Sequence, residues 1–154
     1  MTSDPNRFLV WGCVNPKGED GEGYNGLFLT DSDINDCVRN NSLSGLPVKV
    51  EHCGVDVGKV VTSWDSGNGA LQVLLEVDRR VLEGDIVSRF IGASIRQDFS
   101  LGYTVGLKYS DSAKTFQSAT KTYTEVSIVR RGARPSTHIS GFTVLESVTK
   151  KRKA

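Results

Sequence analysis

The sequence has few of the residues that build disulfide frameworks or metal sites, and it has no long apolar run. It contains three cysteines and two histidines among 154 residues, and Cys13, Cys37 and Cys53 lack the spacing of a metal motif. An odd number of cysteines favours reduced thiols in a reducing compartment. No apolar run approaches the ~18 residues of a membrane helix, and the N-terminus has no signal-peptide core. We therefore expect an intracellular protein without a membrane partner.

The chain also lacks an excess of charge of either sign. Its formal net charge is +1, which gives no electrostatic reason to expect specific nucleic-acid binding. Residues 1–148 contain no repeat and no linker, and their length fits one domain. Residues 149–154 (TKKRKA) form a basic C-terminal tail, whose KKRK run is also the pattern of a nuclear-localisation or nucleic-acid-binding patch.

Glycine, in contrast, is frequent, with 16 residues, and turn signals recur at short intervals, so a mainly β fold is expected. A hairpin is predicted at residues 66–69 (SGNG). A first helix should begin after Thr30 and bury Ile34, Cys37 and Val38. The strands are expected at residues 7–14, 26–29, 46–51, 57–64, 70–78, 93–107, 121–129 and near 139–145.

A second helix is predicted after Asp78, which can cap it, and Gly92 should end it. Its apolar stripe would be Leu82, Ile86 and Phe90, flanked by Val87 and Ile91. Together these elements predict a closed or nearly closed antiparallel barrel of about seven strands with two short flanking helices.

The extended stretch around Ser100 is the first candidate site. Alternation places Phe99, Leu101 and Tyr103 on one side, so that the Ser100 hydroxyl points away from the core. Gly102 has no side chain on the face that Ser100 uses, which permits a close approach by another backbone. Alone, a serine on a strand is most often an ordinary surface residue.

Two further stretches change that interpretation. Residues 46–52 (LPVKVEH) with 57–60 (VGKV) resemble the histidine segment of herpesvirus assemblin. Residues 99–103 (FSLGY) resemble the serine segment, and more closely the S-[IL]-G-[FY] pattern of tailed-phage prohead proteases. Residues 125–135 (EVSIVRRGARP) are similar to the E-V-S-L-V-x-x-[PG]-A-x-P stretch of the phage enzymes. The resemblance covers most of the chain, and the three segments occur in the family order.

The resemblance implies a capsid maturation protease, a serine endopeptidase that needs no metal or cofactor. Ser100 would be the nucleophile, His52 the general base, and Glu125 the group that orients the imidazole. The herpesvirus branch has a second histidine where this chain has Glu125. Arg130 and Arg131 lie in the segment that serves the oxyanion in the herpesvirus enzymes, and the choice between them stays open.

Other residues compete for these roles. Ser94, within residues 92–95 (GASI), resembles the Gly-x-Ser-Leu context of assemblin and is the alternative nucleophile. His138 is the other histidine and would restore a Ser-His-His set, but no motif surrounds it. The competing class of function is a non-enzymatic β-barrel, either a virion or scaffold component or a protease relative that has lost activity.

The resemblance also implies partners and a location. Scaffold and capsid precursor proteins would be the substrates, bound as an added β-strand, and a homodimer is compatible with the family. The site of action would be the immature capsid, in the nucleus for a herpesvirus-like protein or in the bacterial cytoplasm for a phage protein. Because assemblin-type enzymes cut after alanine, Ala154 is the expected P1 residue of a self-cleavage site.

Overall fold

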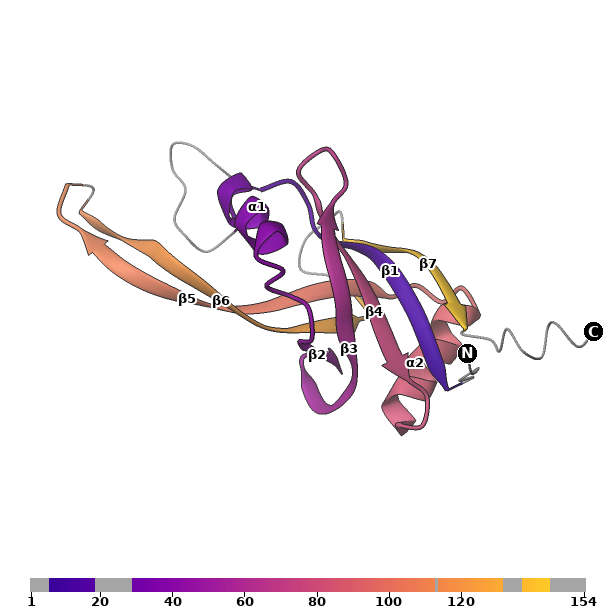
Figure 1. Ribbon diagram of the computed structural model, residues 1–154. Helices are drawn as coiled ribbons and strands as arrows, with labels where there is room; N and C mark the ends of the chain where they lie inside the picture. The colour runs from indigo at the N-terminus through magenta and orange to yellow at the C-terminus, as the bar shows by residue number, and fades with distance from the viewer. Residues whose placement is uncertain (1–5, 19–28, 113, 132–136, 145–154) are drawn as a thin grey trace, which may run out of the picture.

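Seven strands form a single sheet in the computed structural model of the chain (Figure 1). The structure describes residues 6–18, 29–112, 114–131 and 137–144, without the side chains of 107, 108, 110 and 115–119. The strands are β1 (Arg7–Asn15), β2 (Pro47–Val50), β3 (Cys53–Asp65), β4 (Leu71–Asp78), β5 (Asp98–Ser110), β6 (Thr115–Val129) and β7 (His138–Val144). The helices are α1 (Asp31–Arg39) and α2 (Leu82–Gly92).

The sheet is open and mixed, so the prediction of a closed or nearly closed antiparallel barrel was wrong. The strand order is β5-β6-β2-β3-β4-β1-β7, and β2 runs parallel to β6 while the other pairs are antiparallel. The parallel pair joins the β2–β3 hairpin to the β5–β6 hairpin. Among the described residues no ladder joins the outer strands β5 and β7, and a pocket of about 460 Å³ lies between the start of β5 and β7.

The mainly β composition and most of the strand positions were predicted correctly. In β4 the alternating Leu71, Val73, Leu75 and Val77 are fully buried, as expected for a strand with one face on the core. The strands expected at 93–107 and 121–129 are the two arms of a longer hairpin than predicted, since β5 continues to Ser110 and β6 begins at Thr115. This hairpin extends away from the rest of the sheet in Figure 1. Most of the expected strand 26–29 lies outside the described residues.

Helix α1 begins and ends as its sequence indicates, and it is attached to β6. Thr30 caps it, and the Asp33 carboxylate accepts from the Thr30 N–H in a capping box. Asp33 also pairs with Lys121, whose side chain is 5% exposed. Burial of Asp33 would raise the pKa of its carboxyl, but the bonds from Lys121 and Thr30 outweigh it and hold that pKa below its usual value.

Helix α2 presents a different face to the sheet from the one predicted. Leu82, Ile86 and Phe90 are exposed, with exposed fractions of 68%, 41% and 42%. The buried residues are Gly84, Val87, Ser88 and Ile91. Gly84 determines this choice, because a Cβ there would lie 2.4 Å from the Asp78 carbonyl oxygen, so the helix approaches the chain on that side.

The start of α2 also differs from the prediction. Val81 is the N-cap residue, without a side-chain cap, whereas the Asp78 carboxylate accepts hydrogen bonds from the backbone and guanidinium of Arg80. Helix α2 ends at Gly92 as expected. None of the described helices has the length and apolar character needed to cross a membrane.

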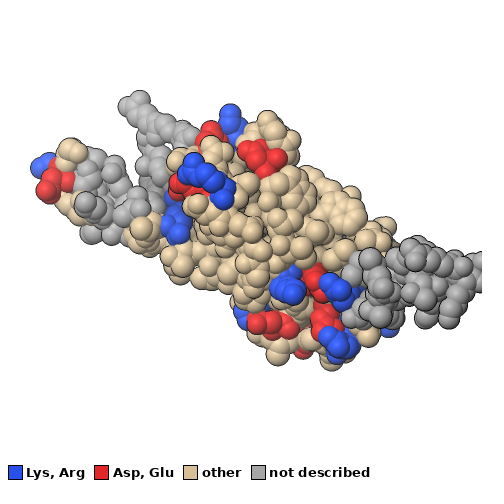
Figure 2. Space-filling view, in the orientation of Figure 1, with Lys and Arg blue, Asp and Glu red and all other residues tan. Residues whose placement is uncertain are grey.

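Charged side chains are mixed in sign over the described surface shown in Figure 2. Acidic and basic groups occur together, and a wide uncharged area separates the clusters. Near α2, for example, Asp85 accepts from both Arg79 and Arg89. This face therefore has no extended area of one sign that would favour a polyanionic partner.

Candidate active site

The β5–β6 hairpin brings two of the predicted site residues next to each other. Ser100 is opposite Ser127, and Gly102 is opposite Glu125 in the antiparallel register. The register then shifts, because Tyr103 is opposite Tyr123 and Thr124 is the extra residue. The resulting bulge lies directly beside Glu125, and bulges of this kind re-aim side chains next to functional sites.

His52 lies in a two-residue turn directly after β2, the strand expected at residues 46–51. Val50 pairs with Cys53, so Glu51 and His52 are the central residues of the β2–β3 turn. Their φ angles are 53° and 59°, which is the pattern of a type I′ turn. That turn strongly prefers Asn-Gly, and a side chain in this backbone region costs about 1–3 kcal/mol. The turn places an imidazole where a glycine is normally found.

The three predicted residues form a continuous hydrogen-bonded chain. The Ser100 Oγ lies 2.8 Å from His52 Nε2, and His52 Nδ1 lies 2.5 Å from Glu125 Oε1. An ionised carboxylate can only accept, so Nδ1 carries the proton and Nε2 is free to accept from the serine hydroxyl. The His52 side chain is 44% exposed and that of Glu125 is 11% exposed. The imidazole is thus open to a ligand from one side while its carboxylate partner is shielded from water.

Gly102 and Ser127 determine where the Glu125 carboxylate lies. A Cβ on Gly102 would be 2.1 Å from Glu125 Oε1, so only glycine allows that oxygen to reach His52. A close approach at Gly102 was expected from a backbone, but the atoms that approach it belong to the side chains of Glu125 and Thr124. The Ser127 hydroxyl donates to Glu125 Oε2 at 2.7 Å. Both carboxylate oxygens therefore have a partner.

The His52 turn is attached to β6 by two further hydrogen bonds, and to Arg130, just after β6, by a third. The Glu51 N–H donates to the Ile128 carbonyl at 3.1 Å, and the His52 N–H donates to the Ser127 Oγ at 3.0 Å. The Glu51 Oε1 accepts from the Arg130 N–H at 2.7 Å. Sequence reasoning did not identify Glu51 or Ser127. The sequence signal for Glu51 was its position next to His52. The signal for Ser127 was its position two residues after Glu125, on the same face of the strand.

The two arginines proposed for the oxyanion directly follow β6, which ends at Val129. Arg130 and Arg131 are both exposed. Arg130 lines a pocket of about 210 Å³ together with Glu51, Ile86 and Phe90. The structure thus brings Arg130 to the His52 turn, and the choice between Arg130 and Arg131 stays a prediction. Ala154 and the basic tail lie outside the described residues.

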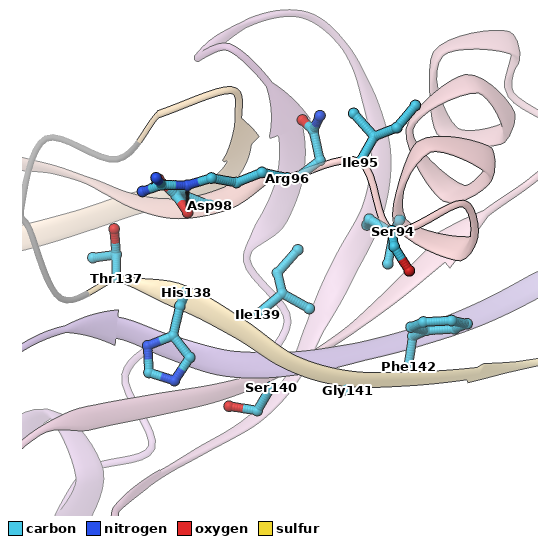
Figure 3. Close-up of a pocket in the computed structure, with 12 residues that line it drawn as sticks. Ser94, Ile95, Arg96, Asp98, Thr137, His138, Ile139, Ser140, Gly141 and Phe142 are labelled. Carbon is cyan, nitrogen blue, oxygen red and sulfur yellow. Dashed lines mark hydrogen bonds and ion pairs between the residues drawn. The ribbon is translucent and has the colours of Figure 1, made fainter.

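Ser94 and His138 belong to different surroundings, at the pocket between β5 and β7 (Figure 3). Ser94 follows α2 with a φ of 61°, and its N–H donates to the Ile91 carbonyl at 3.0 Å. It thus occupies the left-handed position that ends a helix. Figure 3 shows Ser94 and His138 at opposite ends of the pocket, with the His138 ring pointing away from Ser94. The structure does not bring these two residues together.

The described residues contain no group of three or more His, Cys, Asp and Glu that could hold a metal ion. Two cysteines, Cys13 and Cys37, are buried, and Cys53 is exposed. Burial raises the pKa of the Cys37 thiol to about 11, with a smaller lowering by a hydrogen bond from Tyr123. Cys37 is therefore a protonated thiol at neutral pH and is not a nucleophile in this state.

Comparison with solved structures identifies the fold. The protease of Kaposi's sarcoma-associated herpesvirus, in complex with a hexapeptide phosphonate inhibitor, matches with a TM-score of 0.55 and 16% identity. The match covers 88% of this chain and 65% of that one. The chain has the herpesvirus protease fold. A second structure of that protease, bound to a dimer disruptor, matches with a TM-score of 0.54 and 14% identity over 95% of this chain and 80% of that one.

The herpesvirus protease fold confirms the assemblin-like prediction at the level of architecture. No protein-family model matches the chain, and no curated protein matches it. The chain spans about two thirds of the phosphonate-bound herpesvirus protease, since 65% of that chain is covered. The specific likeness to the phage branch, including Glu125 in place of a second histidine, stays a prediction.

Proposed function

We propose that the chain is a serine endopeptidase with Ser100, His52 and Glu125 as its catalytic triad. The observation that carries the proposal is the chain of two hydrogen bonds, 2.8 Å from Ser100 Oγ to His52 Nε2 and 2.5 Å from His52 Nδ1 to Glu125 Oε1. A hydroxyl, an imidazole and a carboxylate in this order form the constellation that activates a serine. The fold shared with a viral protease supports the same conclusion.

Each group has a distinct part in the proposed reaction. Ser100 Oγ attacks the carbonyl carbon of the scissile peptide while its proton moves to His52 Nε2. Glu125 stays ionised, holds the Nδ1 proton and stabilises the imidazolium. The tetrahedral intermediate then collapses, and His52 gives its proton to the leaving amine. Water, deprotonated by His52, attacks the acyl-enzyme, releases the acid product and regenerates Ser100.

The oxyanion of the intermediate also needs hydrogen-bond donors. Removing one such donor typically costs about 2.7–4 kcal/mol of transition-state stabilisation. Arg130 is attached to the His52 turn through the bond from its backbone to Glu51. We propose that Arg130 or Arg131 supplies a hydrogen-bond donor to the oxyanion. Substitution of the arginine that does so should lower the rate of acylation and leave substrate affinity unchanged.

We place this activity in viral capsid maturation. The substrates would be scaffold and capsid precursor proteins, cut inside the immature capsid, and the enzyme would also cut its own precursor. A precursor with additional residues after Ala154 tests the last point. It should be trimmed after Ala154 when Ser100 is intact, and trimming in the Ser100→Ala precursor would contradict self-processing.

A homodimer is the proposed assembly. One of the similar herpesvirus protease structures contains a dimer disruptor. In this chain, Leu82, Ile86 and Phe90 form an exposed apolar stripe on α2. A Phe90→Lys variant should shift a concentrated sample toward monomer in sedimentation velocity, and an unchanged dimer would place the interface elsewhere.

Active-site labelling is the direct test of the enzyme assignment. The protein is treated at high concentration with a peptidyl phosphonate, and the modified residue is located by mass spectrometry. Modification at Ser100, lost in Ser100→Ala and His52→Ala, is the expected result. Modification at Ser94 would show that Ser94, and not Ser100, is the nucleophile. If the concentrated protein is not modified at all, the result favours the non-enzymatic class.

A further inference from the structure

Ser127 is a fully buried serine, with 0% exposure, at the centre of the candidate site. Its hydroxyl accepts from the His52 N–H at 3.0 Å and donates to Glu125 Oε2 at 2.7 Å. One oxygen atom therefore joins the backbone of the residue that carries the imidazole to the carboxylate that orients it.

The two bonds have different consequences for the site. The His52 N–H belongs to a turn residue with a φ of 59°, a conformation that persists only when its surroundings hold it. The bond to Glu125 Oε2 fixes the rotation of the carboxylate, so that Oε1 faces Nδ1. Ser127 reaches both His52 and Glu125 because β2 and β6 are parallel neighbours. Lys49 of β2 is opposite Ser127, and the turn with His52 begins directly after β2.

We propose that Ser127 is a positioning residue that holds the imidazole of His52 and the carboxylate of Glu125 in line with Ser100. This inference rests on the proposed function, because it assigns Ser127 a part in the same triad. Ser127 touches neither the nucleophile's oxygen nor a substrate in this role. It acts through the two groups that it joins, so its loss changes the rate of the chemical step and not ligand affinity.

The alanine variant tests this with two matched controls. Ser88 in α2 is buried too, and its hydroxyl donates to the Gly84 carbonyl at 2.7 Å, away from the site. Ser63 in β3 is buried, and its hydroxyl has no hydrogen-bond partner among the described residues. All three alanine variants remove a buried serine hydroxyl. Ser127→Ala removes one that is hydrogen-bonded within the site, Ser88→Ala one that is hydrogen-bonded elsewhere, and Ser63→Ala one without a hydrogen bond among the described residues.

The main readout is the rate of labelling by a fluorescent peptidyl phosphonate. Ser127→Ala should lower the maximal labelling rate by about 10- to 100-fold, the range expected when reacting groups lose their alignment. The phosphonate concentration for half-maximal rate should stay within about twofold, since alignment and affinity are separate. Ser88→Ala and Ser63→Ala should label as the unmodified chain does, and Ser127→Thr, which keeps the hydroxyl, should recover most of the rate.

A second readout does not depend on activity. The chain has two histidines, so the ring N–H signals in a nitrogen-15 spectrum can be assigned with a His138→Gln variant. The Nδ1 proton of His52 is protected from exchange with water by its bond to Glu125. Its signal should broaden or disappear in Ser127→Ala and persist in Ser88→Ala. Ser127→Cys, with a weak donor of similar size, replaces the alanine variant if the latter does not fold.

The outcomes separate the two proposals. If the unmodified chain is labelled at Ser100 but Ser127→Ala behaves as Ser88→Ala in rate and spectrum, the positioning role is wrong and the protease assignment stands. If the unmodified chain is not labelled, the protease assignment fails, and the His52 signal alone decides whether Ser127 positions the imidazole. A change in half-maximal concentration without a change in rate also contradicts the positioning role.

Discussion

Two turns in this chain each contain two residues with positive φ, but they place different residue types there. The β3–β4 turn has positive φ at Gly67 and Gly69, with values of 98° and 88°. The β2–β3 turn has positive φ at Glu51 and His52. Glycine adopts this conformation without steric cost, whereas a residue with a side chain does not. One turn is therefore easy to form, and the other requires support.

The support of each turn comes from a different source. In the glycine turn the bonds are local, since the Asp65 carboxylate accepts from the N–H groups of Gly67 and Gly69. In the histidine turn the bonds to Glu51 and His52 come from β6, more than 70 residues away along the chain, as in the His52–Ser127 bond with a separation of 75. The first turn can form from its own sequence, and the second forms its geometry only when β6 is in place. Strain retained in this way is a mark of function.

The largest effect is expected from giving the histidine turn a glycine. His52→Gly removes the general base, and loss of the histidine of a serine triad lowers the rate by as much as on the order of 10⁶-fold. Stability should change little, because relief of about 1–3 kcal/mol of strain offsets the lost bond to Glu125. Phosphonate labelling and urea unfolding measure the two effects. A folded variant that still labels at Ser100 would remove His52 from the mechanism.

The next effect concerns the contact that brings Glu125 to the turn. Gly102→Ala places a Cβ where Glu125 Oε1 lies, at 2.1 Å, and should lower the labelling rate by about 100-fold through misplacement of the carboxylate. Gly106→Ala is the control on the same strand. There the nearest atom is the Thr120 Oγ1 at 2.5 Å, which can rotate away. Equal loss of rate in both variants would show that the strand is sensitive to any Cβ.

These contrasts explain which parts of the structure the sequence could predict. Residues 66–69 and the Thr30 cap are local signals, and both were located correctly because their chemistry involves near neighbours only. The triad residues came from resemblance, since nothing local in residues 50–53 indicates that the turn carries His52. Ser127 and Glu51 were missed because the bonds that join them to the site, His52–Ser127 and Glu51–Arg130, connect residues 75 and 79 positions apart. The bond from Ser127 to Glu125 is local, but it has no meaning for a site until His52 is in place.

The errors in the fold have the same origin. The apolar stripe of Leu82, Ile86 and Phe90 has correct helical spacing, but spacing alone does not distinguish it from the adjacent stripe with Val87 and Ile91. Close approach at Gly84 selected the second stripe. Barrel closure was inferred from the number of strands, whereas the pairing of β2 with β6 depends on register between distant segments. Tertiary contacts decided both points.

A smaller effect is expected from the bond between Glu51 and Arg130. Glu51→Ala removes the acceptor for the Arg130 N–H and should cost about 0.5–1.5 kcal/mol of unfolding free energy. Looser support of the turn should also slow labelling, by less than the Gly102→Ala variant does. Glu51→Gln keeps an acceptor oxygen and has the same backbone strain, so it should retain both stability and rate. If the glutamine variant loses as much as alanine, the charge and not the bond is required.

The smallest effect on activity is expected at the glycine turn. A Cβ at Gly67 has no atom within 4 Å, so Gly67→Ala tests the backbone conformation alone. It should lower the free energy of unfolding by about 1–2 kcal/mol, the cost of a left-handed conformation for an L-residue, and leave the labelling rate unchanged. Urea unfolding and phosphonate labelling of the same preparation measure both. If the rate also fell, the β3–β4 turn would be coupled to the site, and the two turns could no longer be treated as independent.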